Sequence, residues 1–141
     1  MGEFGVKVRS GTVEDVEAVL DFWLFAAEGT DRRDSAGKVL ALIERDPEAL
    51  MIAELGDDMV GTLIAGWDGW RAHLYRLAVH PDHRRKGVAR TLLAAAEARF
   101  AEFGAFRADA MVLDGNTLAH HAWSAAGYRR QPEWGRWVKP L

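Results

Sequence analysis

The stretch that most restricts the fold of this chain is HRRKGVARTLL, which runs from His83 to Leu93. Three cationic side chains are followed by Gly87, by the small Ala89 and by apolar residues at helical spacing. The preceding RAHLYRLAV, residues 71–79, alternates as a strand does and ends before Pro81. The segment therefore predicts a strand, a turn and a helix whose start, with its unpaired N–H groups, can attract an anion.

Two interpretations of this stretch are open on the residues alone. Gly87 can be a loop glycine followed by a solvated helix, or it can let the backbone approach a phosphate group closely. In the second case the hydroxyl of Thr91 could join the same cradle. The better-known phosphate loops are excluded, because GVARTL lacks G-x-x-x-x-G-K-[ST] and no G-x-G-x-x-G follows a strand.

The composition narrows the classes of protein to consider. The chain has 141 residues, 49% of them hydrophobic and 28% charged, which predicts a single domain over residues 1–141. With no cysteine, disulfides, thiolate metal sites and cysteine nucleophiles are excluded. The net charge of -3 argues against a nucleic-acid partner. Because no apolar run reaches the roughly 20 residues that span a bilayer, and no secretory leader is evident, we expect a cytoplasmic protein without a membrane partner.

Hydrophobic periodicity predicts an α/β domain. The first helix begins at Thr12, and its expected apolar stripe comprises Val13, Val16, Leu20, Trp23 and Leu24. The other expected helices run from Asp34 or Ser35 to Asp46, from Gly87 to Phe103 and over residues 117–126. Strands are expected at 6–10, 50–55, 58–67, 71–79 and 106–113, with a terminal antiparallel pair at 128–131 and 134–140. The order β-α-α-β-β-β-α-β-α-β(-β) favours a mixed, mostly antiparallel sheet of roughly six or seven strands with about four helices on both faces.

Three motifs resemble those of the GNAT family of N-acetyltransferases. LAVHPDHRRKGVARTLL resembles the family signature, a strand and a turn followed by Arg/Gln-x-x-Gly-x-Gly/Ala at the start of a helix. The family pattern Asn-x-x-Ala-x-x-x-Tyr-x-x-x-Gly-Phe is approximated by Asn116, Ala119, Trp123, Gly127 and Tyr128. GWDGWR, residues 66–71, is similar to the Gly-x-Asp-Gly-x-Arg of a small bacterial subgroup. The resemblance extends to the element order of nearly the whole chain and implies the GNAT fold.

The resemblance implies a site for acetyl-coenzyme A and no metal. The diphosphate is expected on the amides of residues 85–89, and the pantetheine along residues 77–79, where the family's fourth strand bulges and splays from the fifth. The candidate cofactor-binding residues are Leu77, Ala78, Val79, Arg84, Arg85, Lys86, Gly87, Val88, Ala89, Arg90, Thr91, Asn116 and Trp123. Asn116 can also cap the last helix.

The implied reaction is direct attack of an amine on the thioester. An alkylamine with a pKa of about 10.4 is protonated at neutral pH, so a base must first take its proton. His73, Tyr75 and Asp68 are the candidate bases, and relay through a water is an alternative. The backbone N–H of Val79 or of its neighbour is the candidate oxyanion donor.

The family's tyrosine, which protonates the leaving thiolate, is replaced here by Trp123. An indole N–H donates a hydrogen bond but does not release a proton at useful pH. A thiol pKa of about 8.5 makes the thiolate a tolerable leaving group, so that water, Ser124 or Tyr128 could serve. An acetyltransferase remains the first hypothesis, and the alternative is an acetyl-coenzyme A-binding sensor or partner-binding module with little turnover.

The acceptor is expected to be a primary amine of a small metabolite, a protein N-terminus or a lysine. Asp68 and Arg71 form either an ion pair within their turn or a substrate contact. The candidate walls of the acceptor pocket are Trp23, Trp67 and Trp70, although Trp23 also lies on a core stripe. His120 and His121 point about 100° apart on a helix, which is unsuited to one metal ion. Two tryptophans near residue 141 raise the hypothesis of a homodimer.

Overall fold

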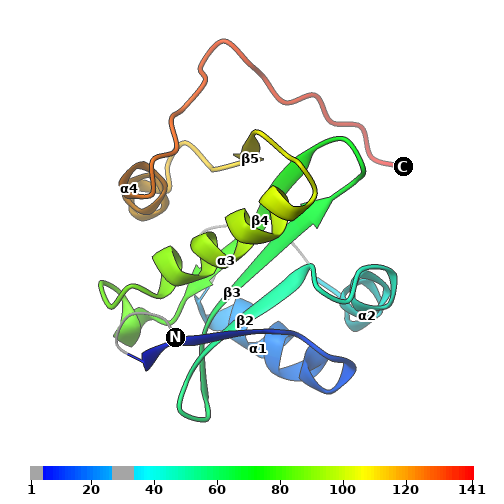
Figure 1. Ribbon diagram of the computed structural model, residues 1–141, viewed down its shortest axis with the longest axis vertical. Helices are drawn as coiled ribbons and strands as arrows, with labels where there is room; N and C mark the ends of the chain where they lie inside the picture. Colours follow the sequence, from blue (N-terminus) through cyan, green and yellow to red (C-terminus); the bar gives the residue numbers. More distant parts are fainter. Residues whose placement is uncertain (1–4, 27–33) are drawn as a thin grey trace.

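The computed structural model describes residues 5–26 and 34–141, which form a mixed sheet with helices on both faces (Figure 1). The strands are β1 (Lys7–Ser10), β2 (Leu50–Leu55), β3 (Asp58–Trp67), β4 (Ala72–Val79) and β5 (Ala108–Ala110). The helices are α1 (Val16–Ala26), α2 (Ala36–Arg45), α3 (Val88–Glu102) and α4 (Thr117–Ala125). This order of helices and strands agrees with the prediction as far as α4.

The five strands lie in their chain order. The pairs β1–β2, β2–β3 and β3–β4 are antiparallel, as expected for strands joined by short turns. The β4–β5 pair is parallel, because α3 carries the chain back across the sheet between them. The predicted mixed, mostly antiparallel sheet is therefore confirmed.

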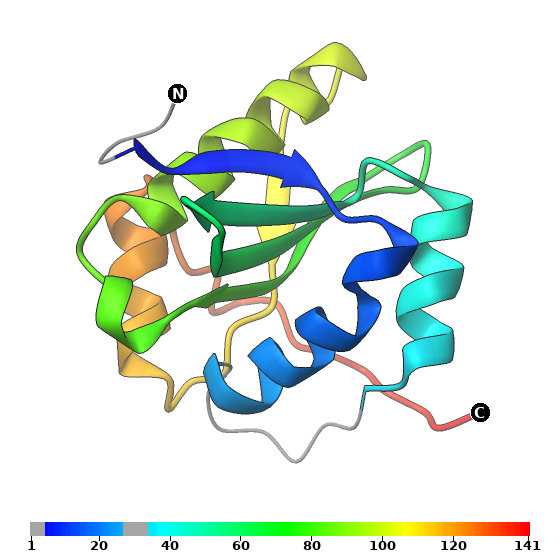
Figure 2. The same ribbon diagram turned by 90° about the horizontal axis from the view of Figure 1, so that it is seen from below.

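Helices cover the sheet on both faces, with α3 (yellow-green) above it, α1 (blue) below it and α2 (cyan) at the right in Figure 2. The α3 side holds one hydrophobic cluster, which includes Leu63, Leu74, Leu92 and Phe100. A second cluster joins α1 and α2 to the opposite face. Gly61 of β3 sits directly under the start of α3, where an added Cβ would lie 2.6 Å from the side chain of Val88. The absence of a side chain at Gly61 thus lets the start of α3 rest on β3.

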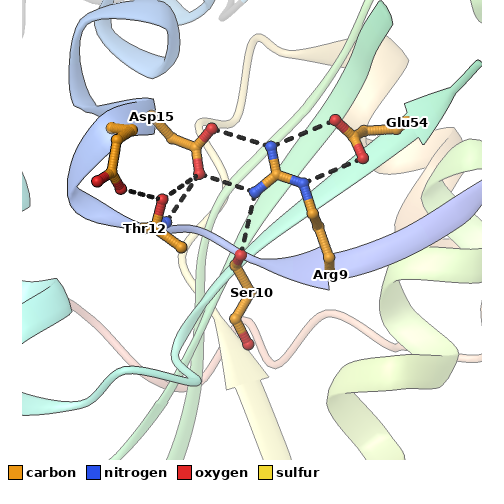
Figure 3. A network of polar contacts seen from close by, with 6 residues as sticks. Arg9, Ser10, Thr12, Asp15 and Glu54 are labelled. Atoms are coloured by element: carbon orange, nitrogen blue, oxygen red, sulfur yellow. Dashed lines mark hydrogen bonds and ion pairs between the residues drawn. The ribbon is translucent and has the colours of Figure 1, made fainter. Parts of the chain in front are cut away.

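A polar network fixes the start of α1 against the sheet (Figure 3). The guanidinium of Arg9 donates to both carboxylate oxygens of Asp15, at 2.7 and 2.9 Å, and pairs with Glu54 of β2 at 3.0 Å. Asp15 also accepts from the backbone N–H of Thr12, as in a capping box. The bonds from Arg9 lower the pKa of Asp15 to about 2, against a partial opposing effect of burial.

The first two helices differ in detail from the prediction. The first turn after Thr12 is a short 3₁₀ helix, Val13–Asp15, and α1 begins only at Val16. The buried residues of α1 are Val16, Val19, Phe22, Trp23 and Ala26. Leu24, placed by the prediction on the buried stripe, is 86% exposed, because at about 100° per residue its position in α1 points away from the face that these residues bury. Ser35 rather than Asp34 caps α2 and accepts from the N–H of Lys38 at 3.2 Å.

The predicted terminal strand pair is wrong. Residues 128–141 contain no strand, so the described part of the chain has five strands instead of six or seven. Pro132 and Pro140 cannot donate to a ladder, and Gly135 weakens a strand interior, which outweighs the apolar–polar alternation used for the prediction. The segment extends past β5 as a loop (Figure 1). In addition, β5 has three residues of the predicted eight.

The described helices were also compared with the length and hydropathy that a membrane span requires. None of those in residues 5–26 and 34–141 is both long and apolar enough to cross a bilayer.

Candidate active site

The central feature of the site is a bulge in β4. Thr62 of β3 pairs with Ala78, and Ile64 pairs with Tyr75, so that one β3 residue faces both Arg76 and Leu77. Arg76 has a φ of 54°, in the left-handed region that non-glycine residues rarely adopt. The extra residue redirects the backbone of residues 77–79 relative to the strand before it.

The β4–β5 pairing ends early on the other side of β4. It covers Ala72 to Leu74 on β4 and Ala108 to Ala110 on β5. Within the described chain, residues 75–79 therefore have no strand partner on this side. The family's bulge and splay, expected at this place, are both present, and they leave an edge of β4 to which an extended ligand can hydrogen-bond.

The start of α3 lies just beyond this open edge in the chain. Its N-cap, Gly87, has a φ of 78° and supplies no side-chain cap to the helix amides. Arg85 is also in the left-handed region, at 64°, which makes the turn before the helix tight. The first-turn amides and the positive end of a 15-residue helix suit a diphosphate.

The side chains around this turn divide into two groups. Arg85, Lys86 and Arg90 are exposed and Arg84 is half-buried, so four cationic residues lie around the start of the helix. Thr91, by contrast, donates its hydroxyl to the carbonyl of Gly87 at 2.7 Å. The hydroxyl of Thr91 is thus bonded within the first turn of α3, and its expected contact with a phosphate stays a prediction.

At the opposite end of β4, His73 lies between two carboxylates. Its Nδ1 is 2.6 Å from Oδ1 of Asp109 on β5, and its Nε2 is 3.7 Å from Oδ2 of Asp68. The side chain of His73 is about one quarter exposed, at 25%. The sequence prediction missed Asp109, because the meeting depends on the β4–β5 register, which pairs these two residues. The sequence did offer one signal for this contact, since Asp109 is an acidic residue within the expected strand 106–113.

Asp68 is held by its own turn. Its Oδ1 accepts from the backbone N–H groups of Arg71, at 2.6 Å, and Trp70, at 2.7 Å. These two bonds lower the pKa of Asp68, with a smaller contribution from His73. Asp68 therefore contacts the backbone N–H of Arg71. One of the two expectations was an ion pair between their side chains.

Tyr75 lies beside His73, with ring centroids 6.0 Å apart, and is 47% exposed. Partial burial raises the pKa of its hydroxyl, and the carboxylates of Asp109 and Asp68 raise it further. Arg136, from the segment after α4, has a smaller opposite effect. Tyr75 consequently stays protonated at neutral pH, and it lines the exposed surface next to His73.

Two residues considered in place of the family's acid, Trp123 and Tyr128, lie in or against the core. Trp123 of α4 is 9% exposed and contacts the ring of Tyr128 edge to face, with centroids 5.0 Å apart. Tyr128 donates its hydroxyl to Glu97 at 2.7 Å. Burial, followed by this bond, raises the pKa of Tyr128, which makes it a weaker acid. Ser124, the other candidate acid, is exposed.

Asn116 caps α4, because its side chain accepts from the backbone N–H of Ala119 at 3.0 Å. The capping alternative is therefore confirmed.

The three candidate tryptophans of the acceptor pocket do not form one wall. Trp23 is 5% exposed in the core and donates to Thr62 at 2.8 Å, which gives it a structural role. Trp67 stacks on Phe103 at 5.4 Å. Trp70 is 83% exposed on the turn between β3 and β4 and remains available to a substrate.

The histidines and carboxylates were also considered as metal ligands. In the part of the chain that the structure describes, no group of three or more His, Asp or Glu residues is placed to hold a metal ion. The Nε2 atom of His120 faces the carbonyls of Leu113 and Asp114, at 3.0 and 3.1 Å. His120 thus contacts the loop before α4.

Known proteins resemble the chain at the levels of sequence and fold. The sequence model of the Acetyltransferase (GNAT) family matches residues 16–128. An acetyltransferase of Pectobacterium atrosepticum is 29% identical over 111 residues, which are 79% of each chain. The PaiA N-acetyltransferase of Thermoplasma acidophilum, in complex with coenzyme A, has a TM-score of 0.81 at 19% identity, covering 92% of this chain and 93% of that one. The structure of yncA from Salmonella typhimurium, with its cofactor acetyl-CoA, has a TM-score of 0.72 at 21% identity and covers 89% and 80%.

Proposed function

The chain belongs to the GNAT family of acetyltransferases, and from this premise we propose that it transfers an acetyl group from acetyl-coenzyme A to a primary amine. Membership confirms the family resemblance and the expected class of enzyme. The likeness of GWDGWR to one bacterial subgroup stays a prediction. The observation that carries the proposal is the bulged, open edge of β4 followed directly by a helix whose glycine N-cap provides no side-chain cap.

We assign the donor to these two neighbouring features. The amides at the start of α3 hold the diphosphate, and Arg84, Arg85, Lys86 and Arg90 lie beside the nucleotide. The backbone of Leu77, Ala78 and Val79 hydrogen-bonds to the pantetheine, as an added strand would. An N–H of Val79 or its neighbour stabilises the oxyanion that forms at the thioester carbonyl.

His73 is the proposed general base. The lowered pKa of Asp68 makes that carboxylate a poor proton acceptor, and the raised pKa of Tyr75 keeps its hydroxyl protonated. An imidazole whose Nδ1–H donates to Asp109 presents an unprotonated Nε2, which can take a proton from the ammonium directly or through a water. Asp109 would hold this tautomer and stabilise the imidazolium that forms, as carboxylates do for other catalytic histidines.

The proposed reaction needs no nucleophilic side chain, because the amine attacks the thioester directly. His73 takes one proton from the ammonium and releases it to solvent. The neutral amine nitrogen then bonds to the acetyl carbon, the carbon–sulfur bond breaks, and the nitrogen loses its second proton to water. The thiolate leaves and takes a proton from water, since a thiol pKa of about 8.5 makes it a tolerable leaving group. Tyr128 is the less favourable acid, because its hydroxyl is bonded to Glu97 and its pKa is raised.

The proposed acceptor is a primary amine. It belongs either to a small metabolite or to a protein, as the N-terminal amine or a lysine side chain. Tyr75, Asp68 and Trp70 are exposed near His73 and are the side chains we assign to its binding. We keep the single domain, the cytoplasmic location and the absence of nucleic-acid and membrane partners as proposals. A homodimer through the exposed Trp134 and Trp137 is a further one.

The alternative function is an acetyl-coenzyme A sensor with little turnover. It is favoured by Trp123, which replaces the family's acid, and by the bond that engages Tyr128.

Thiol release from acetyl-coenzyme A, measured with a panel of small amines and peptides, separates the two functions. We expect at least one amine to accelerate release above hydrolysis. Tight binding in calorimetry without acceleration by any amine would favour the sensor, and absence of binding would contradict both.

A further inference from the structure

A chain of polar contacts converges on the β4 bulge from α1, β3 and the start of α2. We propose that Thr62, Trp23, Arg76 and Asp34 are positioning residues that hold the bulge in the shape that receives the thioester. This inference rests on the proposed function, because it assigns these residues a part in donor binding.

Thr62 is the centre of the chain of contacts. It is fully buried, accepts from Nε1 of Trp23 at 2.8 Å and donates to the carbonyl of Arg76 at 3.0 Å. A threonine hydroxyl has one proton, so the bond from Trp23 directs that proton toward the carbonyl of Arg76. The carbonyl belongs to the bulged residue, immediately before the segment assigned to the pantetheine. Thr62 thereby ties the bulge to the core.

Arg76 provides the second attachment. Its left-handed backbone is unfavourable for a residue with a side chain, so surrounding contacts must stabilise it. Its guanidinium lies 5.2 Å from the ring centroid of Trp23 and forms an ion pair with Asp34, and the side chain is 11% exposed. A charged group this buried requires pairing, which Asp34 and the indole face supply. The strained residue is thus held by both its carbonyl and its side chain.

The location of Thr62 favours positioning over core stability alone. In the described residues only two polar side chains are buried, Thr62 and Arg99, and the rest of the core is apolar. Valine has nearly the same shape as threonine and would fill the site without the hydroxyl. Packing alone would therefore not require threonine here. The hydroxyl pairs with two groups, the buried indole N–H of Trp23 and the carbonyl of Arg76, and the second of these belongs to the bulge.

The test separates the two halves of the donor. Affinities for acetyl-coenzyme A and for phosphoadenosine diphosphate, the nucleotide half of coenzyme A, are measured by calorimetry in wild type, Thr62→Val and Thr62→Ser. We expect Thr62→Val to weaken acetyl-coenzyme A binding about tenfold and nucleotide binding less than about twofold, since only the first ligand reaches the bulge. Thr62→Ser, which keeps the hydroxyl, should bind both ligands as wild type does.

The outcomes distinguish this inference from the proposed function. If wild type does not bind acetyl-coenzyme A, the proposed function fails. If wild type binds but Thr62→Val binds equally well, or loses both ligands equally, only the positioning role is overturned. Should Thr62→Val not fold, Asp34→Asn, a change at a partly exposed site, is measured with the same two ligands. The same selective loss supports the inference, and unchanged or unselective binding overturns it.

Discussion

The two ends of β4 present different kinds of chemistry. At the Val79 end, the strand is bulged, lacks β5 as a partner and leads into the glycine-capped start of α3. At the Ala72 end, the strand is paired on both sides, and its polar groups are the side chains of His73 and Tyr75. Backbone groups therefore dominate the first end and side chains the second.

This difference implies a division between constant and variable function. Backbone amides are supplied by any sequence that keeps the bulge and the turn, so the end that we propose binds the donor should tolerate many side-chain changes. The other end, which we propose binds the acceptor, would depend on the identity of a few exposed residues, among them Asp68, Tyr75 and Asp109. Changes of backbone geometry should consequently affect binding of the donor, and changes of side chain should affect turnover.

The largest expected effect is at the donor end. Gly87→Glu places a side chain on a residue with a φ of 78° and brings a carboxylate to the diphosphate. We expect acetyl-coenzyme A affinity to fall by more than about a hundredfold in calorimetry. Gly104→Glu is the matched control, since Gly104 has a φ of 79° at the far end of α3 with open space around it. Equal affinity of Gly87→Glu and wild type would show that the donor lies elsewhere.

At the acceptor end, His73→Gln should lower kcat by about a hundredfold, because it removes the proposed base. Asp109→Ala should have a smaller effect in the same direction, about tenfold, through loss of the histidine's orientation. His121→Gln, at an exposed histidine of α4 that is assigned to no site, is the control and should change kcat less than about threefold. Steady-state kinetics and acetyl-coenzyme A binding are measured together. A loss of binding as large as the loss of turnover would remove the distinction between the two ends.

Trp123→Tyr should have a smaller effect. It restores the hydroxyl of the family's acid, so we expect unchanged acetyl-coenzyme A affinity and a higher turnover. Thermal unfolding is measured alongside, because Trp123 is buried against Tyr128. Turnover no higher than that of wild type would show that water already protonates the thiolate efficiently or that amine attack limits the rate.

The smallest functional effect is expected at Asp15, which is remote from both ends of β4. Asp15→Asn should lower the free energy of unfolding by about 1 kcal/mol at neutral pH, through the weakened contact with the partly exposed Arg9. Because the folded-state pKa is depressed to about 2 from 3.8, the stabilisation is present above pH 3.8 and is lost as the pH falls through about 2. Denaturant unfolding of wild type and variant from pH 7 to pH 2 should show the difference shrinking over that window. If the difference in unfolding free energy did not depend on pH, the ion pair between Asp15 and Arg9 would be excluded as its source. A change in kcat would contradict the remoteness of Asp15 from the proposed site.

The features that the sequence predicted correctly are local ones. One continuous stretch of chain contains a strand, Pro81, Gly87 and an amphipathic helix. Residues that are neighbours in the sequence therefore determine the order of these elements. The family resemblance added the bulge and the splay. The wrong strand pair at 128–131 and 134–140 had local alternation but depends on a partner edge, which a local pattern does not contain.

The missed features depend on tertiary register. His73 meets Asp109 because β5 pairs with β4 in one particular alignment. Trp23 meets Thr62 although 39 residues separate them. The exposure of Leu24 depends on which face of α1 packs against the sheet and α2. Such contacts are set by packing between elements that are distant in sequence.

Gly61 and Thr62 are consecutive on β3, a strand that we do not assign to any ligand. Gly61 lets α3 pack closely on the sheet, and Thr62 donates a hydrogen bond to the bulge of β4. Under the proposed function, these two residues together set the distance between the sites for the diphosphate and the thioester of one elongated molecule. Efforts to make this scaffold accept longer acyl groups or shortened donors should begin at this dipeptide, although a map of ligand contacts would pass over it.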